Sequence, residues 1–490
     1  MPALWAKVTG EVAAGKRFAG LFATARPGQL LLSVHLADRT GITTMDAAVP
    51  DTAGGYPALT PELGAAFWYE REIHDLFGIV PDGHPRLEPL LLPLHEDAVR
   101  PRPGEPGPAE AQAATPAPDP REIPRHVVGA GMFTIPHGPV RSGVVESVEY
   151  LVETPGEDIP HLNMRVFYKH RGIEKRFEGM TAGDGVLLAE RVEGTATVAH
   201  ALAYCHAIER IAGATVPRTA ALVRVLHAEL ERLGCHLDVA VRLADAAGLA
   251  VATARFGWHK EQVLRLAGRM CGSRFGRGVV VPGGVSMLPL AAPGEILAEI
   301  ARLEQKVTAD AALLMGTASF IDRLRGTGPL TPARASEHGA LGPVGKGSGY
   351  ADDARTARPY DGYQFMRVPP AGPGGDGDAL ARLRVRWDEV SQSCQLIRNA
   401  VGELAKAAAD GELRADGEVA DGRAAGWAEA PQGEVLYDVR IEGGRITRCR
   451  PRSASFHNLV LMHEVFAGDI LTDFPFIEAS FGLSVAGVAG

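Results

Sequence analysis

The sequence WYEREIHDLFGIVPDGHPRLEPLLLP, residues 68–93, decides the fold of the first part of the chain. Residues 60–67 before it are TPELGAAF, and the two pieces together predict a helix over residues 60–78. Thr60 suits the N-cap, Pro61 the first turn and Gly78 the C-terminal stop. Upstream, QLLLSVHLA predicts a strand over residues 29–37.

Charged residues form a stripe along the predicted helix. Glu70, Arg71, His74 and Asp75 fall near i, i+3 and i+4 spacing, beside apolar residues such as Phe77. On spacing alone, a solvated helix face with salt bridges is the ordinary explanation. The residues that follow at fixed spacing favour a family signature instead.

This stretch resembles the signature of the 30-kilodalton subunit of respiratory complex I, of the form E-R-E-x-x-D-x-x-G-I-x-x-x-G-H-P-x-L. The matching positions are Glu70, Arg71, Glu72, Asp75, Gly78, Ile79, Gly83, His84, Pro85 and Leu87. The resemblance implies that residues 1–98 form a small α/β domain of this subunit type.

A proline-rich stretch follows this first domain. Between positions 100 and 120 the sequence holds seven prolines and no aromatic residue, a composition that cannot bury a core. We therefore expect residues 99–125 to be an extended linker. Residues 126–490 are then expected to form a second, larger domain.

Helical periodicity dominates the second domain. Leucines recur at helical spacing across residues 218–243, and further long helices are expected at about 293–325 and 378–407. The stretch EVLYDVRIEGGRITRCRP, residues 434–451, predicts a hairpin around its two glycines. The expected fold class is α+β: a small α/β N-terminal domain joined by a proline-rich linker to a large, mainly helical domain with small β elements.

The hexapeptide HRGIEK, residues 170–175, carries the main match of the second domain to known proteins. Similar stretches begin at residues 216, 268 and 345. Together they resemble the 49-kilodalton subunit of complex I and the large subunit of group 4, formate-hydrogenlyase-type, membrane-bound [NiFe] hydrogenases. The fusion of both subunit types in one chain also occurs in this family.

The hydrogenase resemblance implies four cysteine ligands for nickel and iron, in the motifs R-x-C-G-x-C and D-P-C-x-x-C. Here these motifs align with RVEGTA, residues 191–196, and GLSVAG, residues 482–487. All four cysteines are replaced, and soft thiolates are the donors such a centre needs. We therefore expect no nickel-iron centre and no metal ligands in this chain.

The complex I resemblance implies a quinone site with a histidine and a tyrosine as proton donors. The aligned positions hold Arg141 and, approximately, Ala182. A quinone stays a candidate ligand, although these donors are absent. The sequence has no G-x-G-x-x-G motif after a strand, so NAD is expected only through other subunits.

Three residues are the candidate catalytic groups. Glu174, in HRGIEK, resembles the glutamate that passes protons away from the family's active site, and Glu193 stands where the first cysteine would be. Two carboxylates close together in a closed cavity suit proton relay. Arg171 is the third candidate. The alternative is that Glu174 simply pairs with Arg171 or Lys175.

Three further residues are candidates for a cofactor or subunit interface. The resemblance places His236 next to an iron-sulfur cluster of the neighbouring small subunit, and Asp353 and Arg355 at the interface and cavity wall. A core histidine with satisfied hydrogen bonds is the alternative for His236. On the helix that contains His200, Cys205, His206 and Glu209, packing and surface roles are favoured over a metal site.

Composition excludes some functions. The chain has 490 residues, a net charge of -9 and five scattered cysteines without a C-x-x-C pair, which argues against nucleic-acid binding and a disulfide framework. No apolar run approaches the ~18 residues of a membrane span. We expect a cytoplasmic protein, peripheral on the inner face of the cell membrane.

Two functions remain open from the sequence. In the first, the chain is a subunit of a membrane-associated oxidoreductase that receives electrons from a partner-held [4Fe-4S] cluster. In the second, it is a catalytically silent scaffold that couples a small iron-sulfur subunit to ion-translocating membrane subunits. The expected partners are that small subunit, a ferredoxin-like subunit and membrane subunits.

Overall fold

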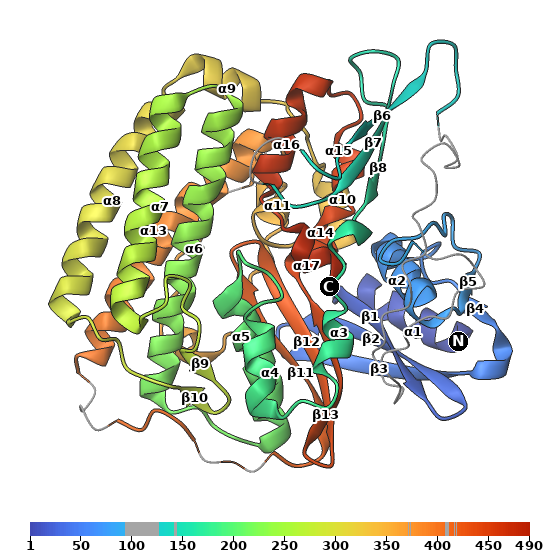
Figure 1. The fold of residues 1–490 in the computed structure, drawn as a ribbon, viewed down its shortest axis with the longest axis horizontal. Coiled ribbons are helices and arrows are strands. Elements are labelled where there is room, and N and C mark those ends of the chain that lie inside the picture. Colours follow the sequence, from blue (N-terminus) through green and yellow to red (C-terminus); the bar gives the residue numbers. More distant parts are fainter. Residues whose placement is uncertain are drawn as a thin grey trace.

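The computed structural model describes residues 1–93, 127–141, 145–370, 372, 374–406, 411–415, 417 and 419–490. The predicted linker, residues 99–125, lies outside the described residues. Figure 1 shows a helical bundle on one side, the N-terminal strands on the other, and a central three-stranded sheet between them. This arrangement confirms the predicted α+β fold class.

The N-terminal part is a β-meander with a helix packed on it. Strands β1, β2 and β3 form an antiparallel sheet in chain order, and β4 pairs in parallel with β5. The predicted strand over residues 29–37 is confirmed as β2. The elements are α1 (Pro2–Ala13), β1 (Arg17–Arg26), β2 (Gln29–Asp38), β3 (Gly41–Pro50), β4 (Gly55–Pro57), α2 (Phe67–Phe77) and β5 (Val80–Asp82).

Helix α2 begins at Phe67, so the prediction of a helix from residue 60 was wrong at its start. Thr60 is no N-cap, because its amide and hydroxyl both donate to the side chain of Glu70, at 2.9 and 2.6 Å. That contact holds the preceding residues in turns against the helix. The end was predicted correctly, since Gly78 terminates α2 in the left-handed region.

The charged stripe of α2 is buried, so the solvated-face interpretation was wrong. Asp75 accepts hydrogen bonds from the amides of Leu90, Leu91 and Leu92, at 2.7, 2.7 and 3.2 Å. Arg71 donates to the carbonyl oxygens of residues 88 and 89. The signature residues therefore satisfy the backbone of the loops that flank the helix.

Four long helices form the bundle. They are α6 (Arg218–Ala246), α7 (Ala250–Cys271), α8 (Pro293–Met315) and α13 (Ala379–Leu404), with α9 (Ala318–Leu324) after α8. The prediction of one helix over residues 293–325 was wrong, because the chain leaves the helix at Gly316 and Thr317. The helix predicted near residues 378–407 is confirmed as α13, with Asp378 as N-cap.

The central sheet consists of β11 (Gly422–Ala430), β12 (Gly433–Glu442) and β13 (Arg445–Arg452), all antiparallel. The hairpin predicted around Gly443 and Gly444 is confirmed, and β11 is an additional strand. Helix α5 (Thr197–Ala212) lies against β11. Their close approach requires Gly426, where an added Cβ would lie 2.1 Å from the carbonyl oxygen of Ala203.

Short elements connect these layers. Strands β6, β7 and β8 form a further antiparallel sheet, and residues 342–347 form the short helix α11. The remaining elements are β6 (Phe133–His137), β7 (Glu149–Thr154), β8 (His161–Arg165), α3 (Ile173–Phe177), α4 (Ala182–Ala189), β9 (Val280–Val281), β10 (Gly284–Val285), α10 (Pro332–His338), α11 (Gly342–Gly347), α12 (Ala354–Ala357), α14 (Ala454–Leu459), α15 (Met462–Val465), α16 (Phe474–Phe481) and α17 (Val485–Ala489).

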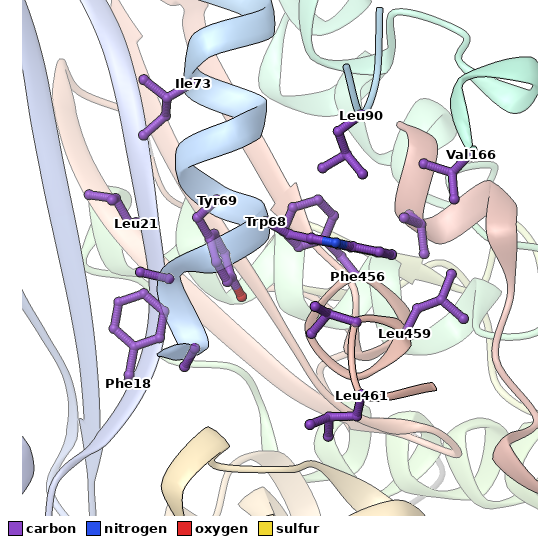
Figure 2. Packing of buried hydrophobic residues seen from close by; sticks show 14 of the residues in the cluster. Phe18, Leu21, Trp68, Tyr69, Ile73, Leu90, Val166, Phe456, Leu459 and Leu461 are labelled. Carbon is purple, nitrogen blue, oxygen red and sulfur yellow. The ribbon is translucent and has the colours of Figure 1, made fainter. Parts of the chain in front are cut away.

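One hydrophobic cluster joins the N-terminal part to the C-terminal segment. Figure 2 shows Trp68 and Tyr69 of α2 beside Phe456 of α14, and the ring centroids of Tyr69 and Phe456 are 4.9 Å apart. Burying each such aromatic ring contributes roughly 1.5–3 kcal/mol. None of the helices in the described part of the chain has the length and apolar character to cross a bilayer.

Candidate functional site

Glu193 lies at the centre of the candidate site, in the loop between α4 and α5. Its side chain is 1% exposed. One carboxylate oxygen accepts hydrogen bonds from the hydroxyls of Thr195 and Ser455, each at 3.0 Å. The other lies 3.4 Å from Nε2 of His200, whose Nδ1 bonds the Tyr437 hydroxyl at 2.8 Å. The carboxylate is therefore buried but surrounded by polar groups.

The structure brings together the positions that align with the nickel-iron motifs. A Cβ added at Gly487 would lie 2.2 Å from Oε2 of Glu193. The amide of Ser484 donates to the Ser455 hydroxyl that also binds Glu193, at 3.1 Å. Ala196 is buried nearby in the chain. These residues offer no thiolate, and the Glu193 side chain fills the space beside Gly487, so a nickel-iron centre does not fit here.

Arg171 holds this loop against the C-terminal segment. Its guanidinium donates to the carbonyl oxygens of Arg191 and Val192, at 2.9 and 2.5 Å, and to that of Ala486 at 2.9 Å. Burial lowers the pKa of Arg171, and the negative charges of Glu146 and Glu193 oppose this shift. Because all its hydrogen bonds to these three residues go to backbone oxygens, Arg171 fixes the position of the loop that carries Glu193.

Glu146 is a second carboxylate at this site that the sequence did not single out. It accepts hydrogen bonds from the Ser484 hydroxyl at 2.8 Å and the Ala486 amide at 2.6 Å. Residues around it have no recognisable motif in the sequence, because Glu146 belongs to the segment before β7 and meets residues 484–486 only in the folded chain.

Glu174 takes partners that the sequence did not predict. Its carboxylate forms ion pairs with Arg450, at 3.0 Å, and with Arg448, both on β13. Arg171 instead bonds backbone, and Lys175 pairs with Glu178 at 2.6 Å. The pairing of Glu174 with Arg171 or Lys175 was therefore wrong. The structure also places Glu174 and Glu193 in separate hydrogen-bond networks.

The second carboxylate beside Glu174 is Glu72 of α2. Arg450 binds Glu72 at 2.6 Å with one nitrogen and Glu174 at 3.0 Å with another. Burial raises the pKa of Glu72 to about 7; the charge of Arg450 opposes this rise, and that of Glu174 adds to it. In the sequence, Glu72 appeared only as part of the E-R-E signature. Nothing there indicated that Arg450 and Glu174, which are far away in the chain, would be its neighbours.

His236, Asp353 and Arg355 meet in one buried charge network. His236 bonds Glu389 at 2.7 Å, Lys346 bonds both Glu389 and Asp353, at 2.7 and 2.6 Å, and Arg355 bonds Asp353 at 2.8 Å. Burial lowers the pKa of His236 to about 4. The His236 side chain is 0% exposed in this chain. Its described contacts are therefore with the buried residues of this network and not with the molecular surface.

The network extends to residues that sequence reasoning missed. Glu229 accepts from Arg355 at 3.1 Å, from the Tyr363 hydroxyl at 2.5 Å and from the Ser393 hydroxyl at 2.6 Å. Nearby charges of Arg355 and Arg232 lower the pKa of Glu229 against the effect of burial. The available signal was the place of Glu229 beside the leucine stripe of α6, on a face that also buries Arg232 and His236.

The helix α5 histidines and cysteine have packing partners. His206 bonds Asp361 at 2.8 Å, Glu209 pairs with Arg224, and burial raises the pKa of Cys205 well above its usual value. In the part of the chain that the structure describes, no three His, Cys, Asp or Glu side chains are gathered to hold a metal ion.

The position that aligns with the quinone histidine is also engaged. Arg141 donates two hydrogen bonds to Glu478, both at 2.8 Å, and Tyr150 donates to the same carboxylate at 2.9 Å. The guanidinium lies over the Tyr150 ring, 5.1 Å from its centroid. These hydrogen bonds connect β7 to α16. At the position of the expected quinone histidine, the chain therefore has a guanidinium cation in place of an imidazole.

Comparisons with known proteins match both parts of the chain. A family model described as the 30 Kd subunit of the respiratory-chain NADH dehydrogenase matches residues 16–105. A second, described as the 49 Kd subunit, matches residues 248–418 and 412–489. Together the two models cover the N-terminal sheet, the bundle helices α7, α8 and α13, and the central sheet, whereas α6 lies outside the matched residues.

Individual relatives come from hydrogenases and from NADH-quinone oxidoreductases. Formate hydrogenlyase subunit 5 of Escherichia coli K12 is 28% identical over 92% of this chain and 79% of its own length. The carbon monoxide-induced hydrogenase of Rhodospirillum rubrum is 29% identical over 71% of this chain and 96% of its own length. The C/D subunit of NADH-quinone oxidoreductase from Rhodopseudomonas palustris BisB5 is 28% identical over 80% of this chain and 69% of its own length.

Proposed function

The chain belongs to the family of fused 30- and 49-kilodalton subunits of the respiratory-chain NADH dehydrogenase, and we propose that it moves electrons and protons without nickel-iron chemistry. It is an oxidoreductase subunit of the complex I-like or hydrogenase-4-like kind. The finer proposal is that a small iron-sulfur subunit delivers electrons from a [4Fe-4S] cluster to the region of Glu193. The acceptor there is a quinone or another small oxidant.

The contact between Glu193 and Gly487 carries this proposal. A carboxylate stands where a thiolate would bind metal, and a glycine opposite leaves room for it, since a Cβ added at Gly487 would lie only 2.2 Å from Oε2. A buried carboxylate next to His200 and the hydroxyls of Thr195 and Ser455 can hold and release a proton. The site is thus suited to proton handling during electron transfer.

Arg171 and Glu174 are proposed to support this proton handling in two different ways. Arg171 positions the loop of Glu193 through backbone carbonyls. Glu174 is proposed to pass protons on the side of the N-terminal sheet, where it shares the Arg450 guanidinium with Glu72. We propose that residues 1–98 and 126–490 act as the two functional domains, with Glu72 and Glu174 at their contact.

The proposed setting is a multisubunit assembly on the inner face of the cell membrane. Partners are the small iron-sulfur subunit, a ferredoxin-like subunit and membrane subunits, and NADH or formate oxidation occurs on other chains. His236, Asp353 and Arg355 are proposed to stabilise the face that receives the small subunit.

The test uses the complex purified from its native membrane fraction. Glu193→Gln keeps the shape of the side chain and removes its charge, so we expect turnover with quinone or viologen acceptors to fall about 100-fold. The set of subunits in the complex and the reduction of the iron-sulfur cluster, followed by electron paramagnetic resonance, should stay unchanged. Glu299→Gln, on the accessible surface of α8, is the matched control and should keep full turnover.

The scaffold function is the second candidate. It is favoured by the network of His236, Asp353 and Arg355, because these side chains find their partners inside this chain. If Glu193→Gln leaves turnover unchanged while changes in that network release the small subunit, the chain is a scaffold and the electron-transfer proposal fails.

A further inference from the structure

A pocket lies where the β1–β2 hairpin meets the β12–β13 hairpin. Its volume is about 380 Å³, and it is lined from both hairpins and by residues 178 and 179 after α3. Figure 1 shows β13 at the edge of the central sheet that faces the N-terminal strands. The volume lies within the roughly 300–1,000 Å³ of small-molecule sites.

Positive charge exceeds negative charge in this pocket. Arg26 and Arg440 share one carboxylate, that of Glu442, at 3.1 and 3.8 Å, and the Glu442 side chain is 46% exposed. Arg445 donates to the carbonyl oxygen of Gly179 at 3.0 Å. Among the described residues it has no carboxylate partner. Three guanidinium groups therefore face one partly solvated carboxylate.

The other charged groups of the lining are already paired. Arg448 binds Glu174, and Glu178 binds Lys175 at 2.6 Å. Arg440 is destabilised in its charged form. Burial lowers its pKa, and repulsion by the positive charges of Arg26 and Arg423 lowers it further. A bound anion would relieve this repulsion.

Two buried polar atoms of the lining have no hydrogen-bond partner in the described part of the chain. They are Nη2 of Arg26 and the hydroxyl oxygen of Thr447. Buried donors without partners are uncommon in native proteins and call for an explanation. Both atoms belong to the pocket with excess positive charge, so one missing acceptor would explain both.

We propose that this pocket binds the phosphate group of a small molecule, through Arg26, Arg440, Arg445 and the hydroxyl of Thr447. Guanidinium groups bind phosphate oxygens with two parallel hydrogen bonds, and a hydroxyl can donate a further one. The pocket exceeds the size of phosphate alone, so the group is attached to a larger body. A nucleotide and a phospholipid headgroup offer the same chemistry.

The site connects the two parts of the chain. Arg26 comes from β1, whereas Arg440 and Thr447 come from β12 and β13. A ligand that binds only the folded arrangement stabilises it by RT ln(1 + L/Kd), where L is the ligand concentration, so the effect grows with the logarithm of that concentration above Kd. The phosphate group would therefore strengthen the contact between the N-terminal sheet and the central sheet.

The experiment is a titration of the full chain with inorganic phosphate, pyrophosphate and ADP at low ionic strength, read by calorimetry and thermal unfolding. We expect saturable binding that Arg440→Gln weakens about tenfold or more, the loss of one charge-assisted hydrogen bond. Arg302→Gln, an exposed arginine of α8, is the matched control and should bind as the wild type does.

Vesicles distinguish the two sources. Binding to phosphatidic acid vesicles but not to phosphatidylcholine vesicles assigns a lipid headgroup, whereas tighter binding of ADP than of phosphate assigns a nucleotide. If Arg440→Gln fails to fold, Thr447→Val removes only the hydroxyl and should still weaken phosphate binding. Absence of saturable binding, or equal binding by wild type, Thr447→Val and any folded Arg440→Gln, would overturn the proposal.

Discussion

Glu72 of α2 and Glu174 of α3 share the guanidinium of Arg450, which binds the first at 2.6 Å and the second at 3.0 Å. The two glutamates are far apart in the sequence and belong to the two signatures, E-R-E and HRGIEK. Arg450 also lies between the rings of Phe22 and Phe456, 5.3 and 5.1 Å from their centroids. A charged contact thus crosses the hydrophobic interface between the two matched parts.

The pKa of Glu72 predicts a pH-dependent stability. It is raised from 4.5 to about 7, so the folded chain binds this proton more tightly than the unfolded chain. The contribution to stability is complete below pH 4.5 and is lost as the pH rises through 7, by at most about 3 kcal/mol. Urea unfolding between pH 5 and 8 should show this loss in the wild type, and Glu72→Gln should reduce it.

Glu62→Gln is the control for this measurement, because Glu62 is exposed in the turn before α2. It should follow the wild-type pH profile. If Glu72→Gln follows that profile as well, Glu72 does not titrate in this range.

Gly487→Ala tests the packing of Glu193. The new Cβ would lie 2.2 Å from Oε2 of Glu193, and such overpacking costs about 1–3 kcal/mol. Shortening the opposing side chain in Glu193→Ala should remove most of this cost. A double-mutant cycle by urea unfolding should therefore give a coupling energy of about 1 kcal/mol or more. Additive effects of the two changes would show that the side chain of Glu193 lies elsewhere.

Local patterns predicted the secondary structure well where the periodicity was long. The leucine stripe gave α6 and the glycine pair gave the β12–β13 hairpin, because both depend on neighbours within a few residues. The start of α2 was missed, since it depends on a hydrogen bond between Thr60 and Glu70 that competes with helix capping. The break at Gly316 and Thr317 likewise has only a weak local signal.

The candidate site was only partly predictable. The alignment of two motifs placed residues 193 and 487 at cysteine positions of the family without predicting a contact between them, and the structure brings them together. The partners of Glu174 could not be predicted. Arg448 and Arg450 lie in a hairpin, and arginines on a strand usually face solvent, so the sequence gives no sign that these two are buried. The burial of the charged stripe on α2 also depends on the flanking loops, whose positions cannot be predicted from the spacing of charged residues along the helix.

Asp75→Ala tests whether the buried signature residues stabilise the N-terminal part. Asp75 accepts from three consecutive backbone amides, and the change would leave these donors buried without an acceptor. We expect a loss of about 3 kcal/mol in the free energy of unfolding. Asp82→Ala, at the exposed end of β5, should cost less than about 1 kcal/mol. Equal effects would mean that water replaces the carboxylate.

The buried network around Arg355 gives the last prediction, because it separates stability from catalysis. Glu229 accepts from Arg355, Tyr363 and Ser393, so Glu229→Gln removes one of the two carboxylates that neutralise the buried Arg355, the other being Asp353. We expect a loss of about 3–5 kcal/mol in the free energy of unfolding. Glu261→Gln on α7 removes an ion pair with Arg274 on the surface, where the two side chains are 31% and 48% exposed, and should leave the free energy of unfolding nearly unchanged.

The same two variants in the assembled complex extend this test. If the network supports the face that receives the small subunit, Glu229→Gln should lower the amount of this partner that is purified together with the chain, while the turnover of each intact complex stays near the wild-type value. Glu193→Gln should do the opposite. Loss of turnover per intact complex in Glu229→Gln would instead place the network in the electron or proton path, because a purely structural group changes the number of complexes and leaves their rate unchanged.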